Sequence, residues 1–316
     1  MRKQLALALL ALCTALPAAH AAGTTAETFA DIKQTLGSVP GFFKAFPEEG
    51  LAGAWEDMKS VQMNPNGAVP GKIKELIGLA VSAQIPCKYC VYFHTEAAKL
   101  NGATDREIRE ALVVASDVRR WSTFLNGMQV DESKFRKDVD KMIEFSKEQM
   151  EKKDAPAPTP INVTDAASAY RDVEQTFGFV PNFVKLYPEA GIAGLWKLTK
   201  NLVMNPNGAV SSKYRDLIGL GVAAQVPCKY CTYFHTESLK LEGATDNEIR
   251  EAVAMAASTR HWSTWLNGLQ IDDATFKREI GQVMSYLRKQ SSQAPLAGEH
   301  GGSKRAKQPA KDSSAE

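Results

Sequence analysis

The chain has 316 residues, of which 44% are hydrophobic and 23% are charged, so each half is long and apolar enough to bury a core. The formal net charge is +2, and it falls to zero once Arg2 and Lys3 are removed with the N-terminal segment described next. A neutral chain gives no electrostatic reason to expect nucleic acid or an anionic membrane surface as a partner.

The N-terminus has the pattern of a secretory signal peptide. Arg2 and Lys3 precede an apolar run at residues 5–16, and Ala19-His20-Ala21 has the small residues of a cleavage site. The run is too short to span a bilayer. We therefore expect residues 1–21 to be removed and the mature protein to be periplasmic or secreted, with no membrane insertion.

An internal repeat organises the rest of the chain. The heptapeptide at residues 63–69 recurs unchanged at 204–210, after 141 positions, which is also the distance from Cys87 to Cys228. The repeat predicts two similar domains, a polar linker that contains prolines, and a disordered tail. These are residues 24–150 and 163–290 for the domains, 151–162 for the linker and 291–316 for the tail.

Both copies are predicted to be helical, because proline and glycine punctuate segments that lack the alternation of a strand. In the first copy we expect amphipathic helices at residues 25–36, 51–61 and 72–83. The fold class that follows is all-α.

Two further helices are expected in each copy. In the first copy Pro86 is predicted at the first helical position of a fourth helix, which Asn101 and Gly102 close. The sequence Thr-Asp-Arg-Glu from Thr104 is a capping box that starts a fifth helix, and the second copy repeats such a box from Thr245.

Four tryptophans recur in register with the repeat. Trp55, Trp121, Trp196 and Trp262 are expected in the core, with a wall for an organic substrate as the alternative.

Each copy carries one Cys-x-x-Cys motif followed by a histidine. Cys87 and Cys90 precede His94 in the first copy, and the second copy repeats them as Cys228, Cys231 and His235. A helix N-terminus favours the thiolate form of cysteines in its first turn, and a histidine four residues after the second cysteine lies on the same helix face. The spacing therefore predicts redox chemistry, with His94 and His235 as bases that take a thiol proton.

A carboxylate is expected to join each motif from the preceding helix. If the chain reverses near Ile85, an antiparallel helical hairpin brings Glu75 level with His94. The same count brings Asp216 to His235, although its side chain is one methylene shorter, so we expect a water in that relay or a broken relay. Each carboxylate would orient and polarise its imidazole.

The full pattern resembles the alkylhydroperoxidase D branch of the carboxymuconolactone decarboxylase-like superfamily. The resemblance runs from Glu75 to Gly127 and from Asp216 to Gly268. It implies an all-α, usually oligomeric protein that reduces hydroperoxides or disulfides. It also implies that Cys90 and Cys231 attack the peroxide and that Cys87 and Cys228 resolve the sulfenic acid to a disulfide.

Two features differ from the best-known peroxidases of that branch: the residue between the cysteines and, in the second copy, Asp216 in place of a glutamate. Those enzymes have a histidine between the cysteines, where this chain has Tyr89 and Tyr230, and a phenol is a poor base at neutral pH. The decarboxylase branch does not use the cysteine pair, so the resemblance disfavours decarboxylation.

The sequence thus predicts an exported, thiol-dependent peroxidase or disulfide reductase that needs no organic cofactor and no metal. Its partners would be a small peroxide and a dedicated thiol reductant, because an oxidising compartment keeps such cysteine pairs as disulfides. A general thiol–disulfide oxidoreductase, a metal-binding or scaffolding protein that uses the Cys, Cys and His side chains, and a purely structural disulfide remain alternatives.

Overall fold

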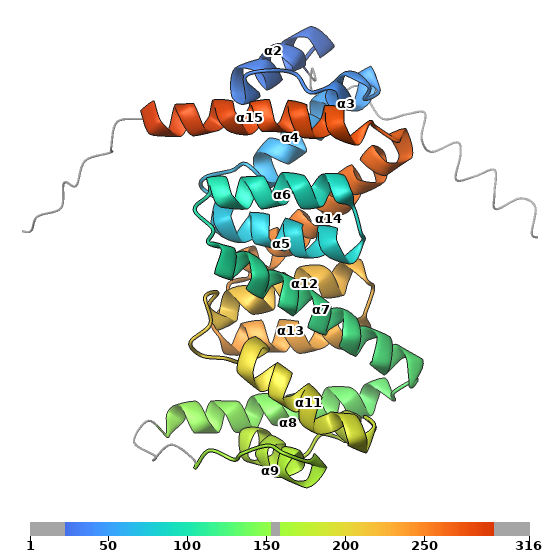
Figure 1. Ribbon diagram of the computed structural model, residues 1–316, viewed down its shortest axis with the longest axis vertical. Coiled ribbons are helices and arrows are strands. Elements are labelled where there is room, and N and C mark those ends of the chain that lie inside the picture. Colours follow the sequence, from blue (N-terminus) through green and yellow to red (C-terminus); the bar gives the residue numbers. More distant parts are fainter. Residues whose placement is uncertain (1–22, 153–158, 294–316) are drawn as a thin grey trace, which may run out of the picture.

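The computed structural model describes residues 23–152 and 159–293, and within them every regular element is a helix (Figure 1). The predicted all-α fold is confirmed. The first repeat contains α2 (Thr25–Leu36), α3 (Gly41–Lys44), α4 (Glu48–Val61), α5 (Gly71–Gln84), α6 (Lys88–Leu100), α7 (Asp105–Gly127) and α8 (Glu132–Glu151).

The second repeat follows the same order with one change of helix type. It contains α9 (Ala166–Phe177), α10 (Asn182–Lys185), α11 (Glu189–Leu198), α12 (Ser212–Gln225), α13 (Lys229–Leu241), α14 (Asp246–Leu269) and α15 (Asp273–Gln293). Where α4 continues to Val61, α11 ends at Leu198 and the chain runs on as the π-helix η2 (Thr199–Val203).

Local signals account for most helix ends. Both predicted capping boxes form, and the side chains of Thr104 and Thr245 accept the backbone N–H of the glutamate three residues later. Gly102 closes the preceding segment with a positive φ of 79°, as a residue without a Cβ can. The position predicted for Pro86 was wrong, because α6 begins two residues later, at Lys88, with Cys87 as its N-cap.

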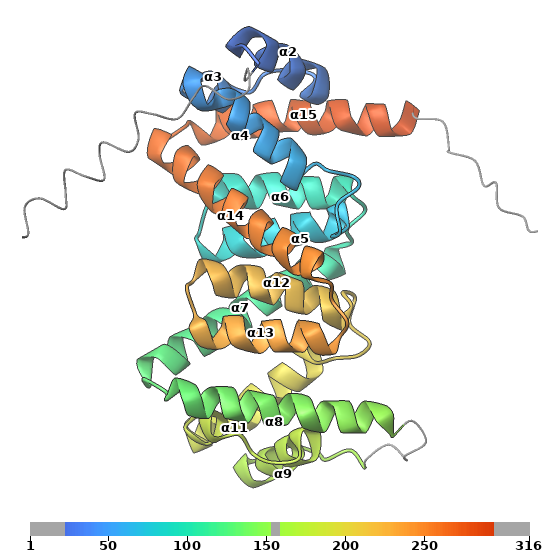
Figure 2. The ribbon, with the colours of Figure 1, turned by 180° about the vertical axis from the view of Figure 1, so that it is seen from behind.

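The two repeats are interlocked rather than separate in space. The last helix, α15, lies across α2 and α6 of the first repeat at one end of the elongated molecule (Figures 1 and 2). At the other end α8 of the first repeat packs against α9, α10 and α13 of the second. The α5–α6 and α12–α13 hairpins occupy the middle, and α7 and α14 cross between the two ends. The residue boundaries of the two domains stay a prediction.

Reciprocal bonds join the repeats. Glu251 of α14 accepts the backbone N–H of Val69 at 2.6 Å and pairs with Lys74 at 2.6 Å. Glu110 of α7 does the same for Ala209 at 2.7 Å and Arg215 at 2.9 Å. Because the members of each ion pair come from different repeats, separating the repeats would leave buried charges without partners.

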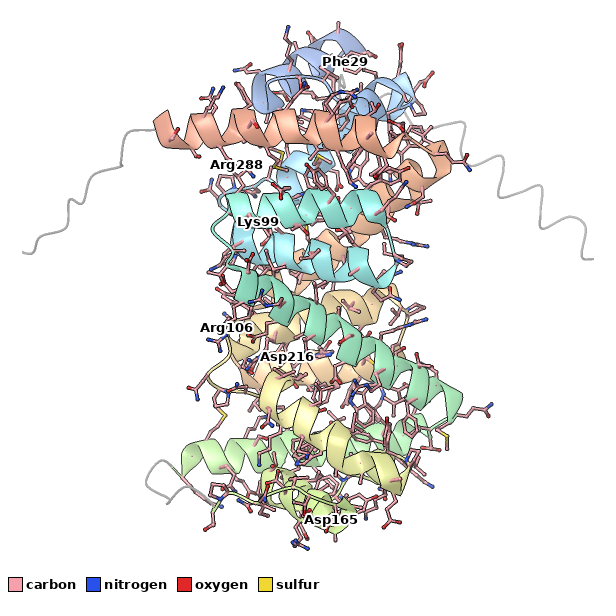
Figure 3. The ribbon with its side chains drawn as sticks, viewed as in Figure 1. Phe29, Lys99, Arg106, Asp165, Asp216 and Arg288 are labelled. Atoms are coloured by element: carbon pink, nitrogen blue, oxygen red, sulfur yellow. A yellow bond between two sulfur atoms is a disulfide. The ribbon has the colours of Figure 1, made fainter. Side chains whose placement is uncertain are left out.

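The C-terminal helix also carries an ion pair between repeats. Arg288 of α15 binds Glu96 of α6 at 2.8 Å. Figure 3 shows Arg288 close to Lys99, which also belongs to α6. The helix continues to Gln293, so the prediction of disorder was wrong for residues 291–293. The hydroxyls of Ser291 and Ser292 donate to backbone carbonyls within that last turn. The rest of the tail and the predicted signal peptide lie outside the described residues.

None of the helices that the structure describes is long and apolar enough to cross a membrane.

Candidate active site

The α5–α6 hairpin brings Glu75 and His94 together as the helix count predicted. Glu75 Oε2 lies 2.7 Å from His94 Nδ1, and both side chains are buried. The imidazole rests directly on α5 at Gly78, where an added Cβ would fall 2.4 Å from its Cε1 atom. A glycine at this position therefore allows the ring to reach the carboxylate.

The same arrangement is complete in the second repeat. Asp216 Oδ1 lies 2.6 Å from His235 Nδ1, and the ring rests on Gly219. The expectation of a bridging water or a broken relay was wrong, because the shorter carboxylate reaches the imidazole directly. Asp216 lies in the middle of the molecule, where α12 and α7 of the two repeats meet (Figure 3).

The two carboxylates have different neighbours on their far side. Gln62 Nε2 donates to Glu75 Oε1 at 3.0 Å, which satisfies the second oxygen of that buried group. At the matching position the second repeat has Val203, and Glu242 lies beside Asp216 instead. Burial and the charge of Asp216 raise the pKa of Glu242 to about 7.

The cysteines of each motif are paired as disulfides at the start of α6 and α13. Cys87 and Cys228 are the N-caps, and their sulfurs accept the backbone N–H of Cys90 and Cys231 at 3.3 and 3.2 Å. This bond and the helix dipole favour negative charge on the first sulfur of each pair. The two cysteines are thus unequal, and the favoured sulfur is not the one that the resemblance makes the attacking cysteine.

Only the second cysteine of each pair faces a cavity. Cys90 lines one cavity together with His94, and Cys231 lines another with His235. Cys87 and Cys228 are fully buried and belong to neither lining.

The tyrosines between the cysteines bind the other repeat. The hydroxyl of Tyr89 donates to the carbonyl of Ile271, and that of Tyr230 donates to the carbonyl of Val130, both at 2.5 Å. Each phenol anchors its disulfide turn to the loop that precedes α15 or α8. These tyrosines therefore have a structural role at the position where related peroxidases, by the resemblance, have a histidine.

The first cavity, next to Cys90 and His94, has a volume of about 30 Å³. Helices α14 and α15 of the second repeat supply Thr259, Trp262, Leu266 and Phe276 to its wall. Thr259 Oγ1 faces His94 Nε2 at 3.5 Å. The first site is therefore completed by the second repeat.

The second cavity, next to Cys231 and His235, has a volume of about 120 Å³ and is almost entirely apolar. Helices α7 and α8 of the first repeat supply one side, including Asp117, Trp121 and Phe135. Trp196 and Thr199 of the second repeat are part of the opposite side. Three of the four tryptophans thus line a cavity, whereas Trp55 is buried elsewhere and donates to Asp31 at 2.7 Å.

Asp117 is a candidate site residue that sequence reasoning missed. It is only 6% exposed, it lines the second cavity with His235, and burial raises the pKa of its carboxyl. The matching residue in the first site is Ser258. The available signal was that a charged residue in one copy corresponds to a serine in the other. The two copies of this helix, from Glu107 to Asn126 and from Glu248 to Asn267, share most of their residues.

No group of three or more His, Cys, Asp or Glu side chains in the described ranges is arranged as a set of metal ligands.

Comparisons with known proteins match the chain to one protein family and to two similar bacterial proteins. The family model for the carboxymuconolactone decarboxylase family matches residues 49–132 and 192–274, which together are more than half of the chain. A protein of Paracoccus denitrificans, described as uncharacterised protein 4 in the cox locus, is 31% identical over 91 residues, 28% of this chain and 82% of that protein. An uncharacterised protein of Cupriavidus necator is 39% identical over 49 residues, 16% of this chain and 43% of its own length.

A solved structure has the same fold. The crystal structure of a protein from Burkholderia xenovorans LB400, described as a gamma-carboxymuconolactone decarboxylase subunit, superposes with a TM-score of 0.52 at 15% sequence identity. The match covers 85% of this chain and all of that one. With both repeats matched by the family model, the chain belongs to the carboxymuconolactone decarboxylase family.

Proposed function

We propose that the protein is an exported thiol peroxidase with two active sites, one at each disulfide. One observation carries the proposal: in each site the second cysteine and a histidine hydrogen-bonded to a carboxylate line the same buried cavity. In the reduced protein this places a thiol, a base that can take its proton, and space for a small substrate together.

The carboxylate determines which nitrogen of the imidazole is available. Because Nδ1 of His94 faces the carboxylate of Glu75 at 2.7 Å, a neutral ring carries its proton there and leaves Nε2 as the base. The carboxylate also stabilises the imidazolium that forms when the thiol gives up its proton. The same reasoning applies to His235 and Asp216.

The reaction then follows from the two sulfurs. The thiolate of Cys90 or Cys231 attacks the terminal peroxide oxygen and the O–O bond breaks. The cysteine becomes a sulfenic acid, and the other oxygen departs as an alkoxide or hydroxide that takes up a proton to become the alcohol or water. The thiol of Cys87 or Cys228 then attacks that sulfur, forming the disulfide and releasing water. A dithiol reductant returns both cysteines to thiols.

Burial favours a small substrate over a protein disulfide. The four cysteines of the two motifs are at most 5% exposed, so a folded protein partner cannot bring its own disulfide to them without an opening of the structure. General thiol–disulfide exchange is therefore the second candidate. Decarboxylation, the reaction in the name of the family, gives no role to a cysteine pair beside the histidine.

The test is peroxide consumption by the protein without residues 1–21, with a small dithiol as the electron source. Sulfenic acid should be trapped on Cys90 in Cys87→Ser protein and on Cys231 in Cys228→Ser protein. A protein that reduces disulfides but consumes no peroxide would favour the second candidate. For export, N-terminal sequencing of the protein from the periplasm or the medium should begin near Ala22.

A further inference from the structure

The two cavities differ in what they can hold. In proteins an apolar cavity of about 150 Å³ binds benzene, whereas a cavity of roughly 10–15 Å³ already holds one water. The second cavity, at about 120 Å³, approaches the first of these sizes, and the first cavity, at about 30 Å³, is close to the second. A compact organic group therefore fits beside Cys231 but not beside Cys90.

Two substitutions in one wall contribute to the difference. Met58 and Gln62 line the first cavity, and the residues at the matching positions, Thr199 and Val203, line the second. Both replacements shorten the side chain. They also lie in η2, where the α-helix gives way to a π-helix, so the backbone of this wall differs as well.

The larger cavity also has two buried oxygens without a hydrogen-bond partner. They are Asp117 Oδ1 and Thr199 Oγ1, both from residues that line it. Arg120 Nη1 is 3.6 Å from that Asp117 oxygen, an ionic contact that is too long for a hydrogen bond. Buried polar groups normally have partners, so these two indicate a ligand with a polar end.

We propose that the second site reduces organic hydroperoxides, with the apolar group in the cavity and the peroxide oxygens between Cys231 and Asp117. This inference rests on the proposed peroxidase function and names its substrate class. The ligand is a hydroperoxide on a compact apolar group, about as large as a phenyl ring. The first site is left with hydrogen peroxide and similarly small molecules.

Asp117 acts as the acid in this site. The thiolate of Cys231 takes the terminal oxygen as its sulfenic acid, and the departing alkoxide receives the proton of the Asp117 carboxyl to become an alcohol. Burial supports this role because it keeps the carboxyl protonated to higher pH. Cys228 gives its proton back to Asp117 when it forms the disulfide. His235 returns the proton that it took from Cys231 to the departing hydroxide, so water is released and both groups are restored.

The experiment compares proteins that keep one site. Cys87→Ser/Cys90→Ser protein keeps the second site, and Cys228→Ser/Cys231→Ser protein keeps the first. With dithiothreitol as the reductant, the ratio of kcat/KM for cumene hydroperoxide to that for hydrogen peroxide should be at least about tenfold higher at the second site. Equal ratios at the two sites would overturn the inference and leave the proposed function intact.

Exchange of the wall residues provides the matched test. Thr199→Met/Val203→Gln installs the residues of the first repeat and should raise KM for cumene hydroperoxide about tenfold. Met58→Thr in the first-site protein should allow some reduction of cumene hydroperoxide. An unchanged KM in the filled variant would contradict the assignment of this cavity.

The role of Asp117 is tested separately from binding. Asp117→Asn keeps the shape and removes the acid, so kcat for cumene hydroperoxide should fall about 100-fold with KM nearly unchanged, and one ionisation should vanish from the pH profile. A purely structural residue would change stability and leave the pH profile intact. Asp117→Ser, which installs the residue of the first site, should behave in the same way as Asp117→Asn.

A binding measurement separates the inference from the peroxidase function. Cumyl alcohol, the product, should bind the intact oxidised protein in calorimetry and should bind at least about tenfold more weakly to Thr199→Met/Val203→Gln protein. If the protein reduces no peroxide, the proposed function fails. Alcohol binding that depends on Thr199 and Val203 would still support the cavity as a site for an apolar molecule with one polar end. Alcohol binding that survives the filling of the cavity would overturn it.

Discussion

The two sites share their chemical groups and differ in their walls. In both, a carboxylate lies within 2.7 Å of a histidine, and a disulfide starts the next helix. The cavities differ about fourfold in volume, and Thr259 faces the histidine in one site where Asp117 lines the cavity in the other. The repeated hairpin thus retains the reactive groups, while the surroundings of the hairpin have diverged.

The interlocked fold explains how this divergence is tolerated. Each site takes its hairpin from one repeat and part of its wall from α7 and α8 or α14 and α15 of the other. A substitution on the face of α7 that lines the second cavity therefore changes the second site, and α7 also packs against α5 of the first hairpin. The consequence is that neither repeat contains a whole site of its own.

Loss of the carboxylate should have the largest effect, and it tests whether the two relays are equivalent. Glu75→Gln in the first-site protein and Asp216→Asn in the second-site protein should each lower peroxide reduction by up to about 10²–10⁴-fold, the usual contribution of a general base, because the histidine loses the group that orients it and stabilises its imidazolium. The measurement is kcat/KM for hydrogen peroxide near neutral pH.

The conservative exchanges Glu75→Asp and Asp216→Glu are the controls. Because both lengths of carboxylate reach an imidazole in this protein, each exchange should retain most of the activity. If neutralising the carboxylate leaves the rate unchanged, the thiolates are activated by the helix N-terminus alone.

The glycines under the two imidazoles should have the next largest effect. In Gly78→Ala and Gly219→Ala protein the new Cβ would fall 2.4 Å from the histidine Cε1, so the ring must move away from its carboxylate. We expect a loss of about 1–3 kcal/mol in the free energy of unfolding and a large loss of activity at the affected site. Denaturant unfolding and single-site assays measure the two effects.

Gly53 and Gly194 provide matched controls. Both lie inside helices, and a Cβ at either position would meet no atom within 4 Å. Replacement by alanine should therefore stabilise the protein by up to about 1 kcal/mol, through helix propensity. Equal effects at Gly53 and Gly78 would mean that the imidazole does not rest on α5 in solution.

The hydrogen bond that Gln62 donates to Glu75 should contribute less. Gln62→Val installs the residue of the second repeat and leaves the buried Glu75 Oε1 without its donor, so we expect a loss of about 1–2 kcal/mol in stability. Reduction of hydrogen peroxide at the first site should fall as well, because the carboxylate that orients His94 loses the partner of its second oxygen. An unchanged rate would show that Gln62 does not act through the carboxylate.

The sequence predicted the reactive groups of each site because their positions depend only on the number of residues between them in one helical hairpin. The distance from Glu75 to His94 in a hairpin follows from the rise of two α-helices, and Asn101 with Gly102 marks the end of the second. Asp216 was misjudged only in its reach, since the shorter side chain still lies 2.6 Å from His235 Nδ1.

The walls were not predicted, for a different physical reason. Two copies of a repeat have nearly the same apolar faces, so the pattern does not tell whether a helix packs on its own copy or on the other. The packing of the long helices α8 and α15 on the other repeat depends on that choice, and so does the role of Tyr89 as an anchor to the loop before α15. Asp117 belongs to the same class, because its cavity is formed mainly by the other repeat.

The smallest predicted effect concerns Glu242, which distinguishes the second carboxylate from the first. Its pKa is raised to about 7 from 4.5, mainly by burial and then by Asp216, while Ser212 and Arg215 act in the opposite direction. Between these two pH values the folded protein keeps a proton that the unfolded chain has released. The free energy of unfolding therefore falls as the pH rises from about 4.5 to 7 and is constant above.

Glu242→Asn installs the residue of the first repeat, Asn101, and removes this dependence. One pKa unit corresponds to about 1.4 kcal/mol, and partial exposure of Glu242 reduces the effect, so the variant should gain about 1 kcal/mol relative to the parent at pH 8 and almost nothing at pH 4.5. Denaturant unfolding at the two pH values measures the difference. The reciprocal Asn101→Glu should introduce the same loss beside Glu75. A gain of equal size at both pH values would mean that packing, and not the proton on Glu242, separates the two sites here.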